Sequence, residues 1–142
     1  MSQAFEDYKP PTRLKLAALW TATMFLYAYG DYFGLYVAGT LADMNRGIMG
    51  PLGPTTPGML VLLSIMMAIP SVMVFLSLII PPASCRWINV VFGIAYTGIM
   101  AISLPGSALF YTVLAIMEMA LTMTIAVMAW RWPKITEKAP TT

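Results

Sequence analysis

Histidine is absent from the sequence, and cysteine occurs once, at Cys85. A lone cysteine cannot form an internal disulfide, and the ligand sets that usually hold zinc, haem or copper need histidine or several cysteines. We therefore expect no metal site and no cofactor. The thirteen methionines do not change this expectation, because they are spread over many helix faces and suit a role as flexible apolar filler.

Charged residues are also scarce. They make up 10% of the sequence, against about 25% in an ordinary soluble domain. Hydrophobic residues make up 59%, and the mean hydropathy is +0.77. The net charge of +2 is not concentrated in one patch, so nothing indicates nucleic acid as a partner. Lipid must be the solvent for much of this chain, which makes the bilayer its first partner.

Four apolar segments are each long enough to cross about 30 Å of hydrocarbon. Glycines and prolines that end helices lie between them. The pattern predicts an all-α membrane protein, a four-transmembrane-helix bundle that forms one domain over residues 1–142. We expect the spans at about 14–37, 57–80, 86–104 and 107–132, with an outer loop at 39–56.

Proline and glycine predict the local structure around the second span. Thr56 followed by Pro57 is typical of an N-cap with proline at the first helical position. Pro70, in the middle of the span, removes one backbone hydrogen bond and sets its ring against the carbonyl of Met66, so a kink is predicted. The preceding connection, 39–56, should form consecutive turns rather than regular helix, because it contains Gly47, Gly50, Pro51, Gly53 and Pro54.

Lysine and arginine predict the orientation, since the cytoplasmic ends of membrane helices carry an excess of them. Arg46 alone falls on the outer face if four spans alternate. Both termini are therefore expected in the cytoplasm. Aromatic belts should mark the two surfaces, with Trp87, Trp130 and Trp132 inside and Tyr32, Tyr36, Phe110 and Tyr111 outside. The seven basic residues on the inner face are Lys9, Arg13, Lys15, Arg86, Arg131, Lys134 and Lys138.

Two acids, Asp31 and Glu118, lie inside predicted spans, with no lysine or arginine deep in a span to pair with them. An ionised Asp near the bilayer centre costs about 2.5–3.5 kcal/mol. Protonating an ordinary Asp at pH 7 costs about 4 kcal/mol, so local hydrogen bonds decide which form is present. An ionisable group inside a membrane is a candidate functional site. If the first and last spans are neighbours, the two acids line one cavity.

Other polar residues share helix faces with the acids or fall at heptad spacing on the third span. The candidate proton, cation or polar-cavity residues beside Asp31 and Glu118 are therefore Tyr27, Tyr96, Asn89 and Thr122.

Small residues form a stripe next to Asp31, where Gly30, Gly34 and Ala38 repeat every four residues. Such a stripe favours close approach of another helix.

The alternative role for Asp31 and Glu118 is structural. In that case each acid hydrogen-bonds its neighbours and only fixes the register of the helices.

Four motifs carry a resemblance to known proteins. On these motifs the chain resembles an uncharacterised, domain-of-unknown-function family of small bacterial four-pass inner-membrane proteins. The resemblance covers nearly all of the chain apart from the termini. It implies a four-helix bundle in the bacterial inner (plasma) membrane, and it implies no activity. The motifs are Tyr-Ala-Tyr-Gly-Asp-Tyr-Phe at 27–33, Met-Gly-Pro-Leu-Gly-Pro at 49–54, Met-Ala-Ile-Pro-Ser at 67–71 and Trp-Arg-Trp-Pro at 130–133.

Three functions remain open from the sequence. The first is a proton- or cation-coupled transporter, oligomeric, that uses the intramembrane carboxylates; small multidrug exporters, also four-pass with a membrane acid, are a fold-level analogy only. The second is an accessory or assembly subunit that docks a larger membrane partner through the small-residue stripe. The third is a membrane enzyme acting on a lipid or quinone. No motif carries a catalytic mechanism, so we expect a transporter rather than an enzyme.

Overall fold

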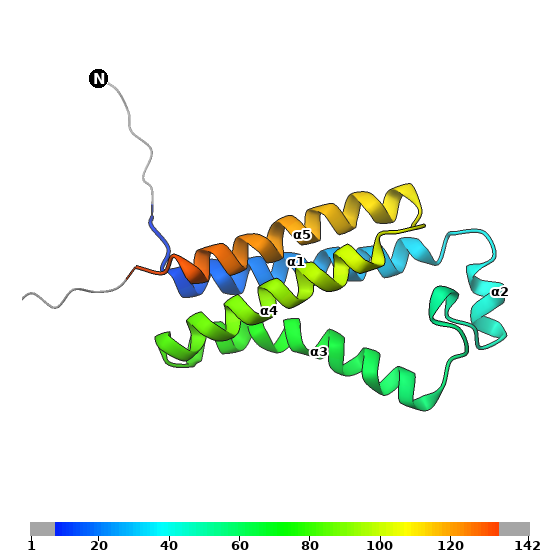
Figure 1. The fold of residues 1–142 in the computed structure, drawn as a ribbon, viewed down its shortest axis with the longest axis horizontal. Helices are drawn as coiled ribbons and strands as arrows, with labels where there is room; N and C mark the ends of the chain where they lie inside the picture. The colour runs from blue at the N-terminus through cyan, green and yellow to red at the C-terminus, as the bar shows by residue number, and fades with distance from the viewer. Residues whose placement is uncertain (1–7, 134–142) are drawn as a thin grey trace, which may run out of the picture.

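The structure is a computed structural model, and it describes residues 8–133. The long helices run alternately up and down, so both ends of the described chain lie at one end of the molecule and α2 lies at the other (Figure 1). The prediction of an all-α protein is confirmed for these residues. The elements are α1 (Thr12–Gly34), α2 (Thr40–Asn45), the 3-10 helix η1 (Gly50–Leu52), α3 (Pro57–Ile79), α4 (Pro82–Ser103) and α5 (Leu109–Trp130).

Three of the described helices, α3, α4 and α5, are long and apolar enough to cross a membrane. They are 23, 22 and 22 residues long, and the mean hydropathies of their most apolar windows are 2.5, 1.4 and 1.9. Helix α1 is also 23 residues long, but Arg13, Lys15 and Asp31 and several tyrosines make it less apolar. The three apolar helices indicate a membrane protein.

The helix ends differ from the expected spans by a few residues. Thr56 caps α3 as expected, since its hydroxyl accepts a hydrogen bond from the Met59 amide at 3.2 Å. Helix α4 begins at Pro82, earlier than predicted, because proline is well tolerated in the first turn. The prediction of turns alone in the 39–56 loop is wrong at its start, where α2 forms. No glycine or proline occurs in Thr40–Asn45, and the helix breakers begin only at Gly47.

The helices pack most closely near the end that holds both chain ends. Helix α1 contacts α3 and α5, and α4 contacts α5, whereas α3 and α4 meet at few points. Towards the α2 end, the first half of α3 leads away from the other helices (Figure 1). The most deeply buried side chains therefore come from the closely packed half: Leu16, Trp20, Met73, Cys85, Asn89 and Ile125.

A buried polar network ties three helices together in that half. The Trp20 indole N–H donates to Asn89 Oδ1 at 2.8 Å, and the Ser77 hydroxyl donates to the same oxygen at 3.3 Å. The Asn89 amide nitrogen donates to the Cys85 carbonyl at 2.8 Å. All four side chains are fully buried. Because buried polar groups need partners where no bulk water reaches, this network fixes how α1, α3 and α4 meet.

Helices α4 and α5 approach each other closely at Gly93. A Cβ placed there would lie 2.8 Å from the Thr122 carbonyl oxygen and 3.0 Å from the Ala126 Cβ. One turn along α4, the hydroxyls of Thr97 and Thr122 share a hydrogen bond of 2.7 Å. A side chain larger than hydrogen at Gly93 would therefore separate the two backbones.

Arginines close two helix ends at the same end of the molecule. The Arg13 guanidinium donates to the Leu78 carbonyl in the last turn of α3 at 2.8 Å. The Arg86 guanidinium donates to the Trp130 carbonyl at 3.2 Å and lies over the rings of Trp87 and Trp130, 5.2 and 5.5 Å from their centroids. Both cations meet carbonyls that the helix leaves without partners, and both complement the helix dipole.

Candidate functional site

A cavity of about 90 Å³ lies between the four long helices, in the half of the bundle towards α2. Asp31 lines it from α1 and Glu118 lines it from α5, so the structure brings together the two acids that the sequence singled out. The wall contains three tyrosines and several methionines. It consists of Tyr27, Gly30, Asp31, Met66, Met67, Tyr96, Ile99, Met100, Ser103, Tyr111 and Glu118.

Polar atoms on this wall lack protein partners. Glu118 is 3% exposed and Tyr27 is 8% exposed. Within residues 8–133, Glu118 Oε2 and the Tyr27 hydroxyl have no hydrogen-bond partner. Asp31 is exposed at the edge and forms no ion pair with the described part of the chain. A buried polar atom without a hydrogen-bond partner costs free energy. A proton, a cation or water in the cavity would supply the missing partner.

Pro70 creates a free backbone acceptor on the same wall. Proline has no N–H, so the Met66 carbonyl, four residues earlier, loses its partner within α3. The Tyr96 hydroxyl of α4 donates to that carbonyl. The contact joins α3 and α4, which otherwise meet at few points. The sequence predicted the proline effect and named Tyr96 as a candidate, but it did not show that one residue compensates for the other.

Two of the six polar candidates lie outside the cavity. Asn89 belongs to the Trp20 network in the closely packed half. Thr122 faces α4, where it pairs with Thr97 and also donates to the backbone carbonyl of Glu118 at 2.9 Å. Four candidates, Asp31, Glu118, Tyr27 and Tyr96, line the cavity together.

The small-residue stripe does not act as one surface. Gly30 is buried, and a Cβ there would lie 3.6 Å from the Leu114 side chain of α5, an ordinary contact. A Cβ at Gly34 would have no neighbour within 4 Å among the described residues. Ala38 lies beyond the end of α1 at Gly34, so the prediction that all three residues share one helix face is wrong. The tight helix contact lies instead at Gly93.

Tyr111 is the site residue that sequence reasoning missed. It was expected in an outer aromatic belt, but it lines the cavity with Glu118. The spacing of seven residues between Tyr111 and Glu118 was the available signal, since residues two turns apart lie on the same helix face.

The expected aromatic belts have partial counterparts at the helix ends. Trp87 packs edge-to-face on Trp130, and the hydroxyls of Tyr32 and Tyr36 lie 2.9 Å apart.

The sequence matches a family of unknown function, DUF6326, over residues 4–139. The chain belongs to this family. Its membership confirms the resemblance to a domain-of-unknown-function family, and the DUF6326 description carries no activity. Comparisons with curated proteins and with solved structures gave no match. In the described part of this DUF6326 chain, His, Cys, Asp and Glu side chains form no group of three that could hold a metal ion.

Replacing Tyr96 by Phe is expected to lower the free energy of unfolding by about 1–3 kcal/mol, because the Met66 carbonyl loses the donor that replaces the missing N–H of Pro70. In a Pro70→Ala background the backbone N–H restored at position 70 can bond the Met66 carbonyl, so the same Tyr96→Phe change should cost less than about 1 kcal/mol. Denaturation in detergent micelles measures the free energy of unfolding of the wild type, Tyr96→Phe, Pro70→Ala and the double variant. Tyr29→Phe serves as control because Tyr29 is exposed. An equal cost in both backgrounds would contradict the compensation.

Proposed function

We propose that this protein is a proton- or cation-coupled transporter in which Asp31 and Glu118 exchange protons or hold a cation. The shared cavity supports this proposal best, because two carboxyl groups on different helices line it. Two carboxyl groups facing one space, without a basic side chain on its wall, favour a proton or a cation as the occupant. A purely structural role for Glu118 is less well supported, since one of its oxygens has no protein partner within the described chain.

The transporter is proposed to cross the bacterial inner membrane four times, with α1 as the first span. Helix α1 packs on both α3 and α5. It is tied to its neighbours by Arg13 at one end and by Trp20 further along. A helix packed in this way between membrane spans is expected to cross with them.

Basic residues support cytoplasmic termini for this topology. Arg46 lies in the α2 region, where it pairs with Asp43 at 2.7 Å. The other basic residues of the described chain lie at the opposite end, where α1 and α4 begin and α5 ends. That asymmetry is the one expected of a membrane protein whose ends face the cytoplasm. These residues are Lys9, Arg13, Lys15, Arg86 and Arg131.

The size of the cavity favours a small cargo. About 90 Å³ is room for a few waters or a small cation, since one water needs roughly 10–15 Å³ on this measure. A larger solute would require the first half of α3 to move outward. That half leads away from the bundle already (Figure 1), and the Tyr96 contact to Met66 is one of its few links to α4. Release of this contact is the proposed opening step.

A docking role for the small-residue stripe remains the alternative. It would use Gly34 and Ala38, which are not covered by other described parts of the chain. Gly30 is already engaged with α5, which weakens this alternative relative to transport.

Proteoliposomes containing a trapped pH-sensitive dye test the proposal. An imposed gradient of Na⁺ or K⁺ should drive proton movement in the wild-type vesicles that protein-free vesicles lack. In the reverse experiment a proton gradient is imposed on the same vesicles, and the uptake of Na⁺ or K⁺ is measured. Coupled transport would be overturned if the dye signal and the cation uptake were the same in vesicles with and without the protein, for each cation tried.

A further inference from the structure

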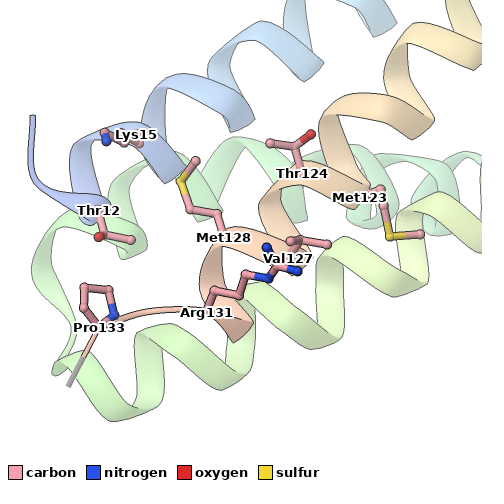
Figure 2. Close-up of a pocket in the computed structure, with 8 residues that line it drawn as sticks. All are labelled: Thr12, Lys15, Met123, Thr124, Val127, Met128, Arg131 and Pro133. Atoms are coloured by element: carbon pink, nitrogen blue, oxygen red, sulfur yellow. The ribbon is translucent and has the colours of Figure 1, made fainter.

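A second cavity, of about 440 Å³, lies at the opposite end of the bundle from the Asp31 and Glu118 cavity. It lies between the first turn of α1 and the last turns of α5. Figure 2 shows Thr12 and Lys15 on α1, Arg131 at the end of α5, and Met128 reaching towards α1 between them. The transport proposal makes no use of this cavity.

The rim of this cavity is positively charged. Lys15 and Arg131 line it from different helices, and neither forms an ion pair within residues 8–133. Helix α1 begins at Thr12 and α5 ends at Trp130, so the dipoles of the two helix ends oppose each other at the rim, and its positive charge comes from Lys15 and Arg131. The Thr12 hydroxyl adds a hydrogen-bonding group, whereas the Thr124 hydroxyl already donates to the Ala120 carbonyl at 2.7 Å. No acidic side chain is among the described residues that line it. These features favour an anion.

The inner wall of the cavity is apolar. Val127 and Met128 line it one turn before Arg131 on α5, and Val127 is 43% exposed. They lie in the last turn of an apolar helix that is long enough to cross a membrane, one turn nearer its middle than Arg131. The ligand should therefore carry its negative charge at one end and a hydrocarbon part at the other.

We propose that this cavity binds an anionic phospholipid of the leaflet at the end where the described chain begins and ends. Its phosphate would lie between Lys15 and Arg131, and its acyl chain would lie along Val127 and Met128. Basic pockets between membrane helices on the cytoplasmic side suit anionic headgroups. A free phosphate would use the rim and leave the apolar wall unused. The site does not involve Asp31 or Glu118, so a test of lipid binding and a test of coupled transport can fail independently.

Native mass spectrometry of the full-length protein in a non-ionic detergent tests the site. The probes are dihexanoyl phosphatidylglycerol, dihexanoyl phosphatidylcholine and inorganic phosphate. We expect the anionic lipid to bind more tightly than either other probe. Lys15→Gln with Arg131→Gln should weaken it roughly 30-fold, because each basic residue near a membrane surface contributes about 1 kcal/mol.

Two further variants separate a built site from general charge. Lys9→Gln with Arg46→Gln removes the same charge from two residues that do not line the cavity, and binding should be unchanged. Lys15→Arg with Arg131→Lys keeps both charges and should retain binding, which also shows that changes at these positions leave the fold intact. Equal binding of the two lipids, equal binding of inorganic phosphate, or an equal loss in the Lys9 and Arg46 variant would each overturn the proposal.

Discussion

Replacing Glu118 by glutamine is expected to reduce coupled proton or cation movement to the level of protein-free vesicles. Glutamine has the shape of glutamic acid but cannot take up or release a proton, and it carries no charge to hold a cation. Glu118 is 3% exposed and lines the cavity from its buried side. The substitution therefore removes the chemistry of the site and changes little of its packing. The proteoliposome dye assay measures the loss directly.

Asp31 and Asp43 supply the matched variants for this experiment. Asp31→Asn should also lower the flux, because Asp31 lines the same cavity from α1. Asp43→Asn should leave the flux unchanged, because Asp43 lies in α2 and pairs with Arg46. Size-exclusion profiles in detergent check that each variant stays folded. Wild-type flux in both Glu118→Gln and Asp31→Asn would contradict a role for the acids, whereas equal loss in all three would indicate a general effect of charge.

The sequence predicted the acids for a simple physical reason. In a chain with few charges, a carboxyl inside an apolar segment stands out because lipid makes it costly. The same reasoning identified Pro70, since its missing N–H is a property of the residue alone. These are local statements about Asp31, Glu118 and Pro70. They needed no knowledge of which helices are neighbours. In the structure Asp31 and Glu118 line one cavity, and the Met66 carbonyl accepts a hydrogen bond from Tyr96.

Pairings between helices were not available from the same reasoning. Tyr96 was a candidate because of heptad spacing, but its acceptor, the Met66 carbonyl, lies 30 residues away on another helix. Asn89 was grouped with the acids, although it bonds Trp20, 69 residues away. Periodicity says which residues share a face, and it does not say which face meets which. Tyr111 and Thr122 were misplaced for that reason.

Gly93 gives the clearest case of a contact that pattern alone did not reveal. A repeat of small residues drew attention to Gly30, Gly34 and Ala38, whereas the close approach of two backbones occurs at a glycine outside that repeat. What makes Gly93 special is the Thr122 carbonyl on α5, which only the folded arrangement brings near. The same arrangement sets the position of Glu118, one turn away from Thr122 on the same helix.

Replacing Gly93 by alanine is expected to destabilise the protein by about 1–3 kcal/mol or more. The new Cβ would lie 2.8 Å from the Thr122 carbonyl oxygen and 3.0 Å from the Ala126 amide nitrogen. Both are backbone atoms that cannot rotate away, so α4 and α5 must separate. The separation should also lengthen the Thr97–Thr122 hydrogen bond. Thermal unfolding in detergent gives the loss of stability.

Gly98 is the matched control, because it lies on the same helix and a Cβ there has no neighbour within 4 Å among the described residues. Gly98→Ala should cause no loss and can add up to about 1 kcal/mol through helix propensity. Since Thr122 donates to the Glu118 backbone, Gly93→Ala should also lower flux in vesicles, whereas Gly98→Ala should not. Equal stability of the two variants would mean that α4 and α5 do not meet at Gly93, and the placement of Glu118 in the cavity would then lose its support.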